Sequence, residues 1–584
     1  MNTQPDPQIT VLDAGGQYAH LIARRVREFG VYADVRPSPT DASELASRRG
    51  VIISGGPASV YEPDSPTVDP ALFHSGPAVL GICYGQQLMA HLMEGGSVRK
   101  GDRGEYGSAV LHRLADAPLF GGLGETEQVW MSHRDQVDSP PTGFVLLAST
   151  ETCRVAAIGD PGRRLYGVQF HPEVVHTPNG MRVLSNFVFD ICGCVKDWDP
   201  KGRIAQVEED IRRTAAGRHV FFFVSGGVDS SVAYRLCRQA LGEERVRGAY
   251  VDTGLMREGE TDFVRRALGV EVVDARAEFL GALVGVKEPE RKRHIIGEQF
   301  VAVQDRVLQS GHYLDGDWIL GQGTIYPDTI ESGGTAKADL IKTHHNRVAG
   351  IQKLLDAGRI IEPLTSFYKD EVREVGRELG LPNELLDRHP FPGPGLAIRL
   401  LCSGEEADVE PLEDGWLVPV HSVGVQGDSR SYRPVLAYDA QPSAELLDRA
   451  THAVNRISRV NRVVAHVAGH ARMADQRVRQ AYLDATRLER LRHADSIVRA
   501  HSHDSGFDAD VWQFPVVVIP CGTADRPASV VLRPIHSVDG MTAQSVLMPP
   551  ELAARMAADL MAVPGICSVY YDLTHKPPAT IEWE

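Results

Sequence analysis

The sequence predicts two successive α/β domains with doubly wound, largely parallel sheets, followed by an α+β domain. Short apolar runs alternate with amphipathic stretches over most of residues 8–399, a pattern typical of sheets covered by helices on both faces. Two apolar runs end in glycine-rich turns that lead into a helix, at residues 81–85 and 225–231. Beyond about Leu400 the alternation stops, and Arg-rich helical and β-rich stretches follow.

Length, charge and composition indicate a globular protein of several domains and argue against nucleic-acid and membrane partners. A chain of 584 residues has room for about three or four domains, and its 43% hydrophobic and 24% charged residues are typical of globular proteins. The net charge of −16 argues against a nucleic-acid partner, and the lack of any run of about 18 apolar residues argues against a membrane partner. Eight scattered cysteines and a polar N-terminal stretch without signal-peptide features predict a reduced, cytoplasmic protein.

The first domain is expected over residues 8–195. Its apolar runs predict strands, and the later ones predict a partly antiparallel section of the sheet. Amphipathic stretches after two of these runs predict helices. The expected strands are 9–13, 51–53, 78–82, 129–132 and 165–170, and the expected helices are 20–29 and 86–93.

The second domain is expected over residues 196–399 and opens with a polar linker. A helix and a strongly apolar strand come next, and further alternation predicts another doubly wound sheet. A Pro- and Gly-rich stretch at residues 388–399 predicts a loop. The expected helices are 204–215 and 260–268, and the expected strands are 219–224, 247–252, 270–274 and 318–321.

The third domain is expected over residues 400–584. An Arg-rich stretch at about residues 444–501 predicts a continuous helical region, and an α+β arrangement follows it. No internal repeat is evident in the sequence. The later elements are expected at 514–519, 530–534, 550–561 and 566–572.

Cys83 is the first candidate for chemistry. It lies in Gly81-Ile-Cys-Tyr-Gly85, the thiol counterpart of the nucleophile elbow of hydrolases. Flanking glycines allow a tight turn, and the adjoining helix N-terminus favours the thiolate. His171 and Glu173, which follow another predicted strand, could take the thiol proton and orient that base. A buried structural cysteine is the alternative, since free cysteines are mostly inert.

Two further loops complete this candidate site. Gly56 and the backbone N–H of Tyr84 are expected to stabilise an oxyanion, although an ordinary glycine turn would look the same. Asp135 and Gln87 are candidates for binding the amino group of glutamine. Together these motifs resemble the class I glutamine amidotransferases, which convert glutamine to glutamate and ammonia. The resemblance implies a nucleophile, a general base and acid, and an orienting carboxylate, namely Cys83, His171 and Glu173.

A second glycine-rich turn follows the apolar strand 219–224. Its glycines expose backbone N–H groups, its serines add hydroxyl donors, and the following helix adds its positive end. The lysine of a Walker A loop is absent, which argues against that type of phosphate chemistry. The motif resembles the loop of N-type ATP pyrophosphatases, which adenylylate a carbonyl oxygen of their substrate. The resemblance implies ATP binding by Ser225, Gly226, Gly227, Val228, Asp229, Ser230 and Ser231.

Charged residues farther along the chain are expected to serve the same site. Each alone would be read as a solvated surface group, but together they could neutralise the triphosphate or help to activate the acceptor. The candidates are Lys342, His344, His345, Lys369 and Asp370. Mg²⁺ is the expected cofactor with ATP, because it needs only one or two carboxylates besides phosphate oxygens, and Asp229 is its candidate ligand.

The two halves together resemble the glutamine-hydrolysing GMP synthetases over nearly the whole chain. The tail, Asp572–Glu584 with its Lys-Pro-Pro-Ala-Thr-Ile-Glu-Trp-Glu run, looks like the C-terminal signature of that family. The resemblance implies that ATP adenylylates XMP and that ammonia then displaces AMP to give GMP. It also implies a set of XMP-binding residues, Arg257, Asp428, Gln513, Arg533, Lys576 and Glu582.

Other readings stay open at this point. A ligase of this kind could act on deamido-NAD or a tRNA base, although a tRNA enzyme would be expected to carry a basic domain or zinc cysteines. A nucleotide-sensing scaffold with dead sites would be expected to lack some motif residues, and all are present. A helical, Arg-rich insertion at about residues 430–503 departs from compact members of the family, which dimerise through this domain, so a homodimer and a monomer both remain open.

Overall fold

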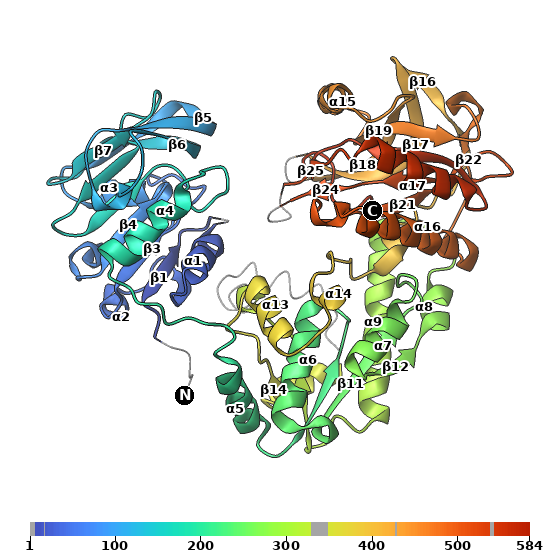
Figure 1. Cartoon of the computed structure of the whole chain (residues 1–584), viewed down its shortest axis with the longest axis horizontal. Helices are drawn as coiled ribbons and strands as arrows, with labels where there is room; N and C mark the ends of the chain where they lie inside the picture. Colours follow the sequence, from blue (N-terminus) through green and yellow to red (C-terminus); the bar gives the residue numbers. More distant parts are fainter. Residues whose placement is uncertain (1–5, 17, 329–348, 427–428, 538–541) are drawn as a thin grey trace. The chain divides into compact units, whose positions relative to one another are not determined.

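The computed structural model describes residues 6–16, 18–328, 349–426, 429–537 and 542–584 (Figure 1). The chain packs as two compact units. The first comprises Met1–Gln206 together with two short later segments, Ile325–Ala338 and Ser366–Glu371. The second comprises Val207–Thr324, Asp339–Thr365 and Val372–Glu584.

The first unit is built on a nine-stranded sheet. Its order is β2-β1-β3-β4-β9-β8-β7-β5-β6, in which β1 to β4 and β9 run parallel and the remaining pairs are antiparallel. The strands are β1 (Ile9–Asp13), β2 (Ala33–Pro37), β3 (Gly50–Ile53), β4 (Ala78–Ile82), β5 (Ser97–Arg113), β6 (Thr126–Ser139), β7 (Val145–Ser149), β8 (Ala157–Asp160) and β9 (Leu165–Val168). The principal helices are α1 (Ala19–Glu28), α3 (Tyr84–Leu92) and α4 (Gly180–Ser185).

Both faces of the parallel part of this sheet are covered. Ile52 and Leu80 pack into one core cluster, whereas their neighbours Val51 and Val79 pack into another. Successive side chains of a strand point to opposite faces, so both sets must be apolar when both faces are buried. This double burial explains why these strands read as continuous apolar runs in the sequence.

The second unit begins with a five-stranded parallel sheet of order β12-β11-β10-β13-β14. The order reverses at β10, which has β11 on one side and β13 on the other, and such a reversal marks the usual ligand crevice of doubly wound sheets. The strands are β10 (His219–Phe223), β11 (Val246–Asp252), β12 (Glu271–Asp274), β13 (Trp318–Gly321) and β14 (Ile360–Ile361). The flanking helices include α5 (Ile204–Ala215), α6 (Val228–Leu241), α7 (Glu260–Leu268), α9 (Pro289–Ser310) and α13 (Lys369–Glu378).

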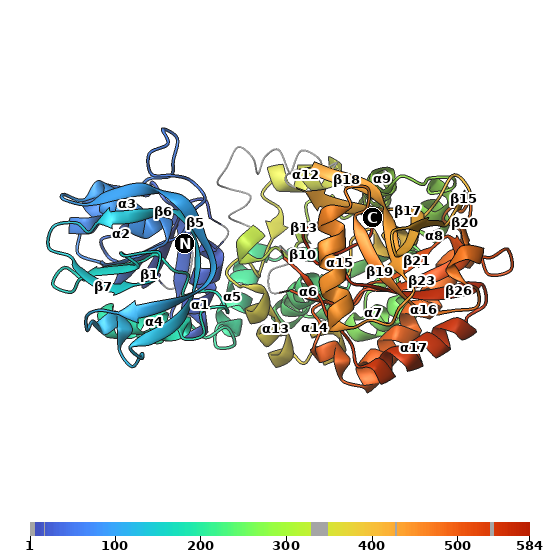
Figure 2. The ribbon, with the colours of Figure 1, turned by 90° about the horizontal axis from the view of Figure 1, so that it is seen from above.

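The second unit also contains a seven-stranded sheet of order β16-β17-β18-β19-β26-β23-β21. Helices α15, α16 and α17 contribute apolar side chains to the core on one face, and α16 and α17 lie side by side (Figure 2). The strands are β16 (Glu410–Leu412), β17 (Gly415–Gln426), β18 (Ser429–Tyr438), β19 (Arg462–Gly469), β21 (Val516–Ile519), β23 (Ala528–Leu532) and β26 (Ile566–Asp572). The helices are α15 (Ala444–Arg456), α16 (Ala485–Asp504) and α17 (Pro550–Ala562).

The predicted fold class is confirmed, with one correction in the third region. The expected continuous helical stretch at about residues 444–501 is wrong, because β19 and the short β20 (Arg477–Val478) separate α15 from α16. The first five residues of β19 are all buried, and the strand pairs on both sides, with β18 and β26. Among the described residues, no helix is long and apolar enough to cross a membrane.

Candidate active sites

Cys83 occupies a strained turn between β4 and α3. Its φ of +54° lies in the left-handed region, which is uncommon for a residue other than glycine. A Cβ atom at Gly81 would lie 2.5 Å from the backbone of Gly85, and one at Gly85 would lie 2.4 Å from the carbonyl oxygen of Ile53. The two glycines therefore allow the strand and the helix to approach closely enough to form the elbow.

His171 reaches this turn because β9 is the parallel neighbour of β4. Its Nδ1 lies 2.7 Å from Oε1 of Glu173, and both side chains are buried. Burial alone lowers the pKa of His171, but the Glu173 carboxylate and the Cys83 sulfur outweigh burial and raise that pKa well above its ordinary value. The arrangement therefore favours the protonated imidazolium form of His171.

The glycine turn after β3 meets the same point. A Cβ atom at Gly55 would lie 3.0 Å from Cε1 of His171 and 3.5 Å from Cβ of Cys83. Gly56 packs against the strand-end backbone, where a Cβ atom would lie 2.4 Å from the carbonyl oxygen of Ala14. The turn that carries the predicted oxyanion residue thus lies directly against Cys83 and His171.

Tyr84 and Gln169 add two details to the nucleophile's surroundings. Tyr84 is the first residue of α3, so its backbone N–H belongs to the first turn, where amides have no partner within the helix. Its hydroxyl donates a hydrogen bond to the carbonyl oxygen of Pro66 at 2.7 Å, which holds the ring in place. The role predicted for Tyr84 concerns only its backbone N–H group. Nε2 of Gln169 lies 3.5 Å from Sγ of Cys83, a contact that sequence reasoning missed.

Asp135 lies within β6, where it pairs with β5, and not in a loop as expected; it is held from two sides. Nε2 of Gln87 donates to its backbone oxygen at 2.7 Å, and the hydroxyl of Ser59 donates to its Oδ2 at 2.5 Å. The carboxylate is almost completely buried. Gln87 therefore acts on Asp135 through the backbone, while Ser59, which the sequence analysis did not select, positions the carboxylate itself.

A second histidine–carboxylate pair lies beneath Asp135. Nε2 of His133 lies 3.2 Å from Oε2 of Glu105, and Nδ1 of His133 lies 3.1 Å from the backbone oxygen of Asp135. Cys153 completes a trio whose potential ligand atoms lie within 4.8 Å of one another. Burial raises the pKa of the Cys153 thiol to about 12, and the other two residues pair with each other.

The second candidate site is the turn between β10 and α6, at the point where the strand order reverses. Its serine hydroxyls are paired within the turn: Oγ of Ser225 lies 3.0 Å from Oγ of Ser230, and Oγ of Ser231 donates to the carbonyl oxygen of Gly227 at 2.7 Å. Gly226 has φ of +76°, and a Cβ atom there would lie 2.8 Å from Val264. Ser225 and Gly227 are exposed, so the turn presents hydroxyl and backbone groups to solvent at the start of a helix.

A hollow of about 330 Å³ opens at the carboxyl ends of β11 and β12 in the same sheet. Asp252 and Arg257 are among its lining residues. Nε of Arg257 lies 3.4 Å from Oδ2 of Asp495 on α16, and the guanidinium lies 4.5 Å from the ring centre of Phe391. Burial lowers the pKa of Arg257 to about 10, although Asp495 opposes this effect.

Of the predicted lid residues, three lie outside the described residues: Lys342, His344 and His345. Lys369 and Asp370 begin α13 and belong to the first unit. There Oδ1 of Asp370 lies 3.1 Å from Nε of Arg24 on α1, which makes Asp370 part of an ion pair inside that unit. Arg27, one turn further along α1, donates to the carbonyl oxygen of Ser366 at 2.7 Å.

Of the predicted XMP-binding residues, Lys576 and Glu582 belong to the tail of the chain, Arg533 contacts it, and Asp428 lies outside the described residues. Arg533 is completely buried, and its guanidinium donates to the carbonyl oxygens of Thr574, Thr580 and Ile581 at 2.8–3.0 Å. Glu582 accepts two hydrogen bonds from Arg399, at 2.7 and 3.0 Å. These two predicted residues therefore also fix the shape of the tail.

Gln513 and Lys576 are anchored through other contacts. Nε2 of Gln513 donates to the carbonyl oxygen of Pro390 at 2.5 Å, so this side chain reaches the Pro- and Gly-rich loop. Lys576 exchanges backbone hydrogen bonds with Ala543, and its side chain is half-buried. Both residues lie in the second unit, as expected for one substrate-binding region.

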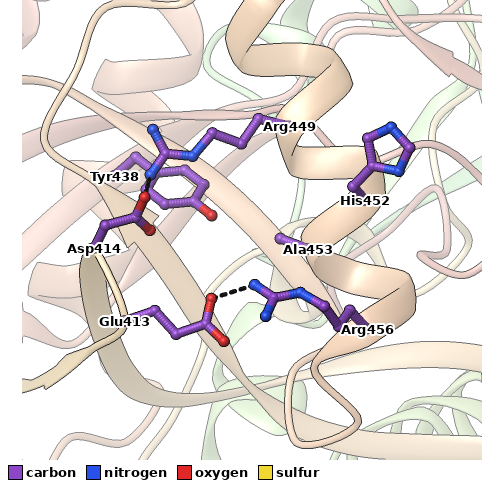
Figure 3. A pocket seen from close by; sticks show the side chains of 7 residues that line it. All are labelled: Glu413, Asp414, Tyr438, Arg449, His452, Ala453 and Arg456. Atoms are coloured by element: carbon purple, nitrogen blue, oxygen red, sulfur yellow. Dashed lines mark hydrogen bonds and ion pairs between the residues drawn. The ribbon is translucent and has the colours of Figure 1, made fainter.

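A separate hollow of about 290 Å³ lies beside α15 (Figure 3). Arg456 pairs with Glu413 there, and Arg449 pairs with Asp414 and stacks 4.2 Å from the ring centre of Tyr438. Of the predicted site residues that the structure describes, none lines this hollow. Its opposite charges are matched to one another, as in ordinary surface ion pairs.

Comparison with known proteins agrees with both halves of this description. Residues 10–191 match the model of glutamine amidotransferase class-I, and residues 500–583 match that of the GMP synthase C terminal domain. The chain is similar to the glutamine-hydrolyzing GMP synthases of Symbiobacterium thermophilum (41% identity, covering 99% of both chains) and Thermomicrobium roseum (40% identity, covering 99% of this chain and 96% of that one). A solved glutamine amidotransferase of Thermotoga maritima is 18% identical, covers 32% of this chain and 99% of its own, and has a TM-score of 0.27. The chain therefore belongs to the family of glutamine-hydrolysing GMP synthases.

Proposed function

We propose that the chain makes GMP from XMP, ATP and glutamine through two chemical centres, at Cys83 and at the Ser225–Ser231 turn. The observation that carries this proposal is the meeting of Cys83, His171 and Glu173 at one buried point, in a chain of this family. The second centre is supported by the position of its turn at the strand-order reversal of a parallel sheet.

In the first half-reaction, the Cys83 thiolate attacks the amide carbon of glutamine. The developing oxyanion is stabilised by backbone N–H groups at Gly56 and Tyr84, and His171 gives its proton to the departing ammonia. Water then attacks the thioester with His171 as base, which releases glutamate and restores the thiol. Asp135 binds the substrate's amino group, and Ser59 and Gln87 hold Asp135 in place.

In the second half-reaction, the C2 oxygen of XMP attacks the α-phosphorus of ATP, and pyrophosphate leaves. Ammonia then attacks C2 of adenylyl-XMP and displaces AMP, which gives GMP. The Ser225–Ser231 turn holds the phosphates through backbone N–H groups and hydroxyls, and Lys342, His344, His345, Lys369 and Asp370 are the proposed lid. XMP binding is proposed for Arg257, Asp428, Gln513, Arg533, Lys576 and Glu582.

Mg²⁺ is proposed to accompany ATP. Asp229 lies in the first turn of α6, immediately after the phosphate-binding glycines, and a carboxylate there suits a hard cation that also binds phosphate oxygens. When bound, the ion would neutralise charge on the triphosphate. Because the reaction uses cytoplasmic metabolites and none of the eight cysteines forms a disulfide, we propose a cytoplasmic location. The proposed function is compatible with a monomer and with a homodimer.

The decisive assay is pyrophosphate release with ATP and a panel of acceptors. We expect release with XMP and none with deamido-NAD or tRNA. Release with another acceptor, and silence with XMP, would contradict the proposed substrate. Glutaminase activity measured in parallel distinguishes a misassigned acceptor from an inactive preparation.

A further inference from the structure

The two halves of the seven-stranded sheet share one topology. In the first half, the antiparallel pair β17–β18 is followed by α15 and then by β19, which is parallel to β18. In the second half, the antiparallel pair β21–β23 is followed by α17 and then by β26, which is parallel to β23. The two halves meet where β19 and β26 pair antiparallel, as two-fold symmetry requires.

The match extends to individual residues. α15 and α17 begin 106 residues apart (550 − 444) and end 106 apart (562 − 456). The same offset makes Val463 on β19 equivalent to Val569 on β26. Val463 pairs with Leu436 on β18, and Val569 pairs with Val530 on β23. The equivalent of β18 is therefore offset by 94 residues (530 − 436).

A pseudo-two-fold axis passes between β19 and β26. In the register of this pair, Ala465 opposes Tyr571, and these two residues are equivalent to each other by the 106-residue offset. Val464 opposes Asp572, and His466 opposes Tyr570. By the same offset, Val464 is equivalent to Tyr570 and His466 to Asp572, so the two-fold symmetry converts one of these pairs into the other. Such pairing of identical surfaces is the pattern of an isologous dimer, formed here inside one chain.

Equivalent residues also face the same core. Members of one cluster form equivalent pairs, among them Leu446 with Leu552, Val454 with Leu560, Val463 with Val569 and Leu436 with Val530. On the opposite face of the sheet, a second cluster contains the pairs Val464 with Tyr570, Ala437 with Val531 and Val418 with Ile519. This structural correspondence is not evident in the sequence. Few of these residues are identical, and the offset changes from 101 at β17 (519 − 418) to 94 and then 106, which hides the repeat in the sequence.

Each half carries a charged pair at equivalent positions, but the charges are reversed, and only the pair of the second half is completely buried. In the second half, Arg533 follows β23 and lies 2.8 Å from Asp572 on β26. The equivalent residues of the first half are Asp439 and His466, whose Oδ1 and Nδ1 lie 2.9 Å apart. The first centre thus has an exposed acid where the second, which lies behind the tail proposed to bind an anionic nucleotide, has a buried arginine.

Each centre also receives one residue from the other half. Ser568 of the second half lies 3.1 Å from Nε2 of His466. Its equivalent, Arg462 of the first half, is completely buried and donates to Oδ2 of Asp572 at 2.9 Å. Arg462 also donates to the carbonyl oxygens of Thr580 and Glu582 at 2.9 and 2.7 Å, and so holds the tail that carries Lys576 and Glu582.

We propose that this region is an internal duplication in which the first copy has lost its own anion centre and instead supplies Arg462 as a positioning residue for the nucleotide monophosphate site of the second copy. The inference rests on the proposed XMP site at the tail. It implies that the chain binds one XMP, not two. It also implies that the seam between β19 and β26 makes, within one chain, the contact that two copies would otherwise make with each other.

The test compares Arg462→Met with Ser568→Ala, the change at the symmetry-equivalent position, in the full chain. Arg462→Met is expected to raise the KM for XMP by about tenfold or more, because the tail loses several charge-assisted hydrogen bonds, while the KM for ATP and glutaminase activity stay unchanged. Ser568→Ala is expected to leave all three constants unchanged. Titration calorimetry of the unsubstituted chain with XMP should give one site.

Three outcomes would overturn the proposal. Two XMP sites per chain would mean that the first copy still binds the ligand. An Arg462→Met variant with an unchanged KM for XMP would remove the positioning role, provided that its melting temperature shows a folded chain. Should Arg462→Met not fold, Asp439→Asn decides the matter: the proposal requires an unchanged KM for XMP, and a rise would overturn it. Absence of any XMP binding by the unsubstituted, glutaminase-active chain would instead refute the proposed function.

Discussion

The Cys83 turn and the Ser225–Ser231 turn have the same backbone arrangement but differ in burial and in the contacts of their side chains. Both connect a buried parallel strand to a helix, and both depend on close approach at glycine. Cys83 is 4% exposed and is surrounded by partners that are already in place, whereas Ser225 and Ser230 of the second turn bond each other at an exposed surface.

The difference reflects what each turn must do. A nucleophile has to be held, deprotonated and shielded before substrate arrives, so its neighbours are fixed by the fold. A phosphate-binding turn has to exchange its internal hydrogen bonds for bonds to a highly charged ligand, so its donors stay near solvent. Substitutions at the first turn should therefore cost more than equivalent substitutions at the second.

Among the substitutions that leave Cys83 in place, the largest effect is expected for Glu173→Gln. Loss of the carboxylate leaves His171 without its orienting charge, and glutamine-dependent kcat/KM should fall by about a hundredfold or more. Because Glu173 raises the pKa of His171, its removal lowers that pKa, so the protonated imidazole is lost at lower pH. The alkaline limb of the pH profile should move to lower pH.

The matched control is Glu105→Gln, which removes a carboxylate from the other histidine pair of the same unit. It should leave the alkaline limb in place, because His133 is not the base. An equal shift in both variants would show that the effect on His171 is not specific.

Gly85→Ala and Gly227→Ala compare the two turns directly. The new Cβ would lie 2.4 Å from a backbone oxygen at Gly85 but 3.3 Å from the mobile end of a serine side chain at Gly227. We expect Gly85→Ala to lower the free energy of unfolding by about 1–3 kcal/mol and to impair glutamine hydrolysis. Chemical denaturation should show a smaller loss for Gly227→Ala; a larger loss would reverse the comparison.

Ser59→Ala tests the positioning of Asp135. Removing one hydrogen bond to a buried carboxylate should cost about 1.5–3 kcal/mol, which corresponds to roughly a tenfold or greater rise in the KM for glutamine. Synthesis from added ammonia should not change. A lower kcat with an unchanged KM would assign Ser59 to the chemical step instead.

The smallest effect is expected for Ser230→Ala. The variant loses one of several donors in the ATP turn, so the KM for ATP should rise only about two- to fivefold. Glutaminase activity serves as the internal control and should be unchanged. A loss as large as that of Glu173→Gln would mean that the second turn is as tightly prepared as the first.

Local motifs were sufficient to predict the two strand-to-helix turns and the histidine that lies beside the first of them. Cys83, His171 and Ser225 each lie at the end of a buried strand, where a short sequence determines the turn. The contacts of Ser59 with Asp135 and of Gln169 with Cys83 join loops that only the order of strands brings together, and no local pattern reports that order. The proposed repeat in the third region could not be seen in the sequence for a related reason. Its two copies share their strand order and the positions that face the core, but few of their residues are identical.

The central claim is that Cys83 supplies ammonia to a second centre that works without it. The most direct test is the Cys83→Ala variant, assayed for GMP formation from XMP and ATP with glutamine or with ammonium as nitrogen source. We expect no synthesis with glutamine and a rate close to that of the unsubstituted chain with ammonium. Loss of both activities in a folded variant, or synthesis from glutamine without Cys83, would contradict the account.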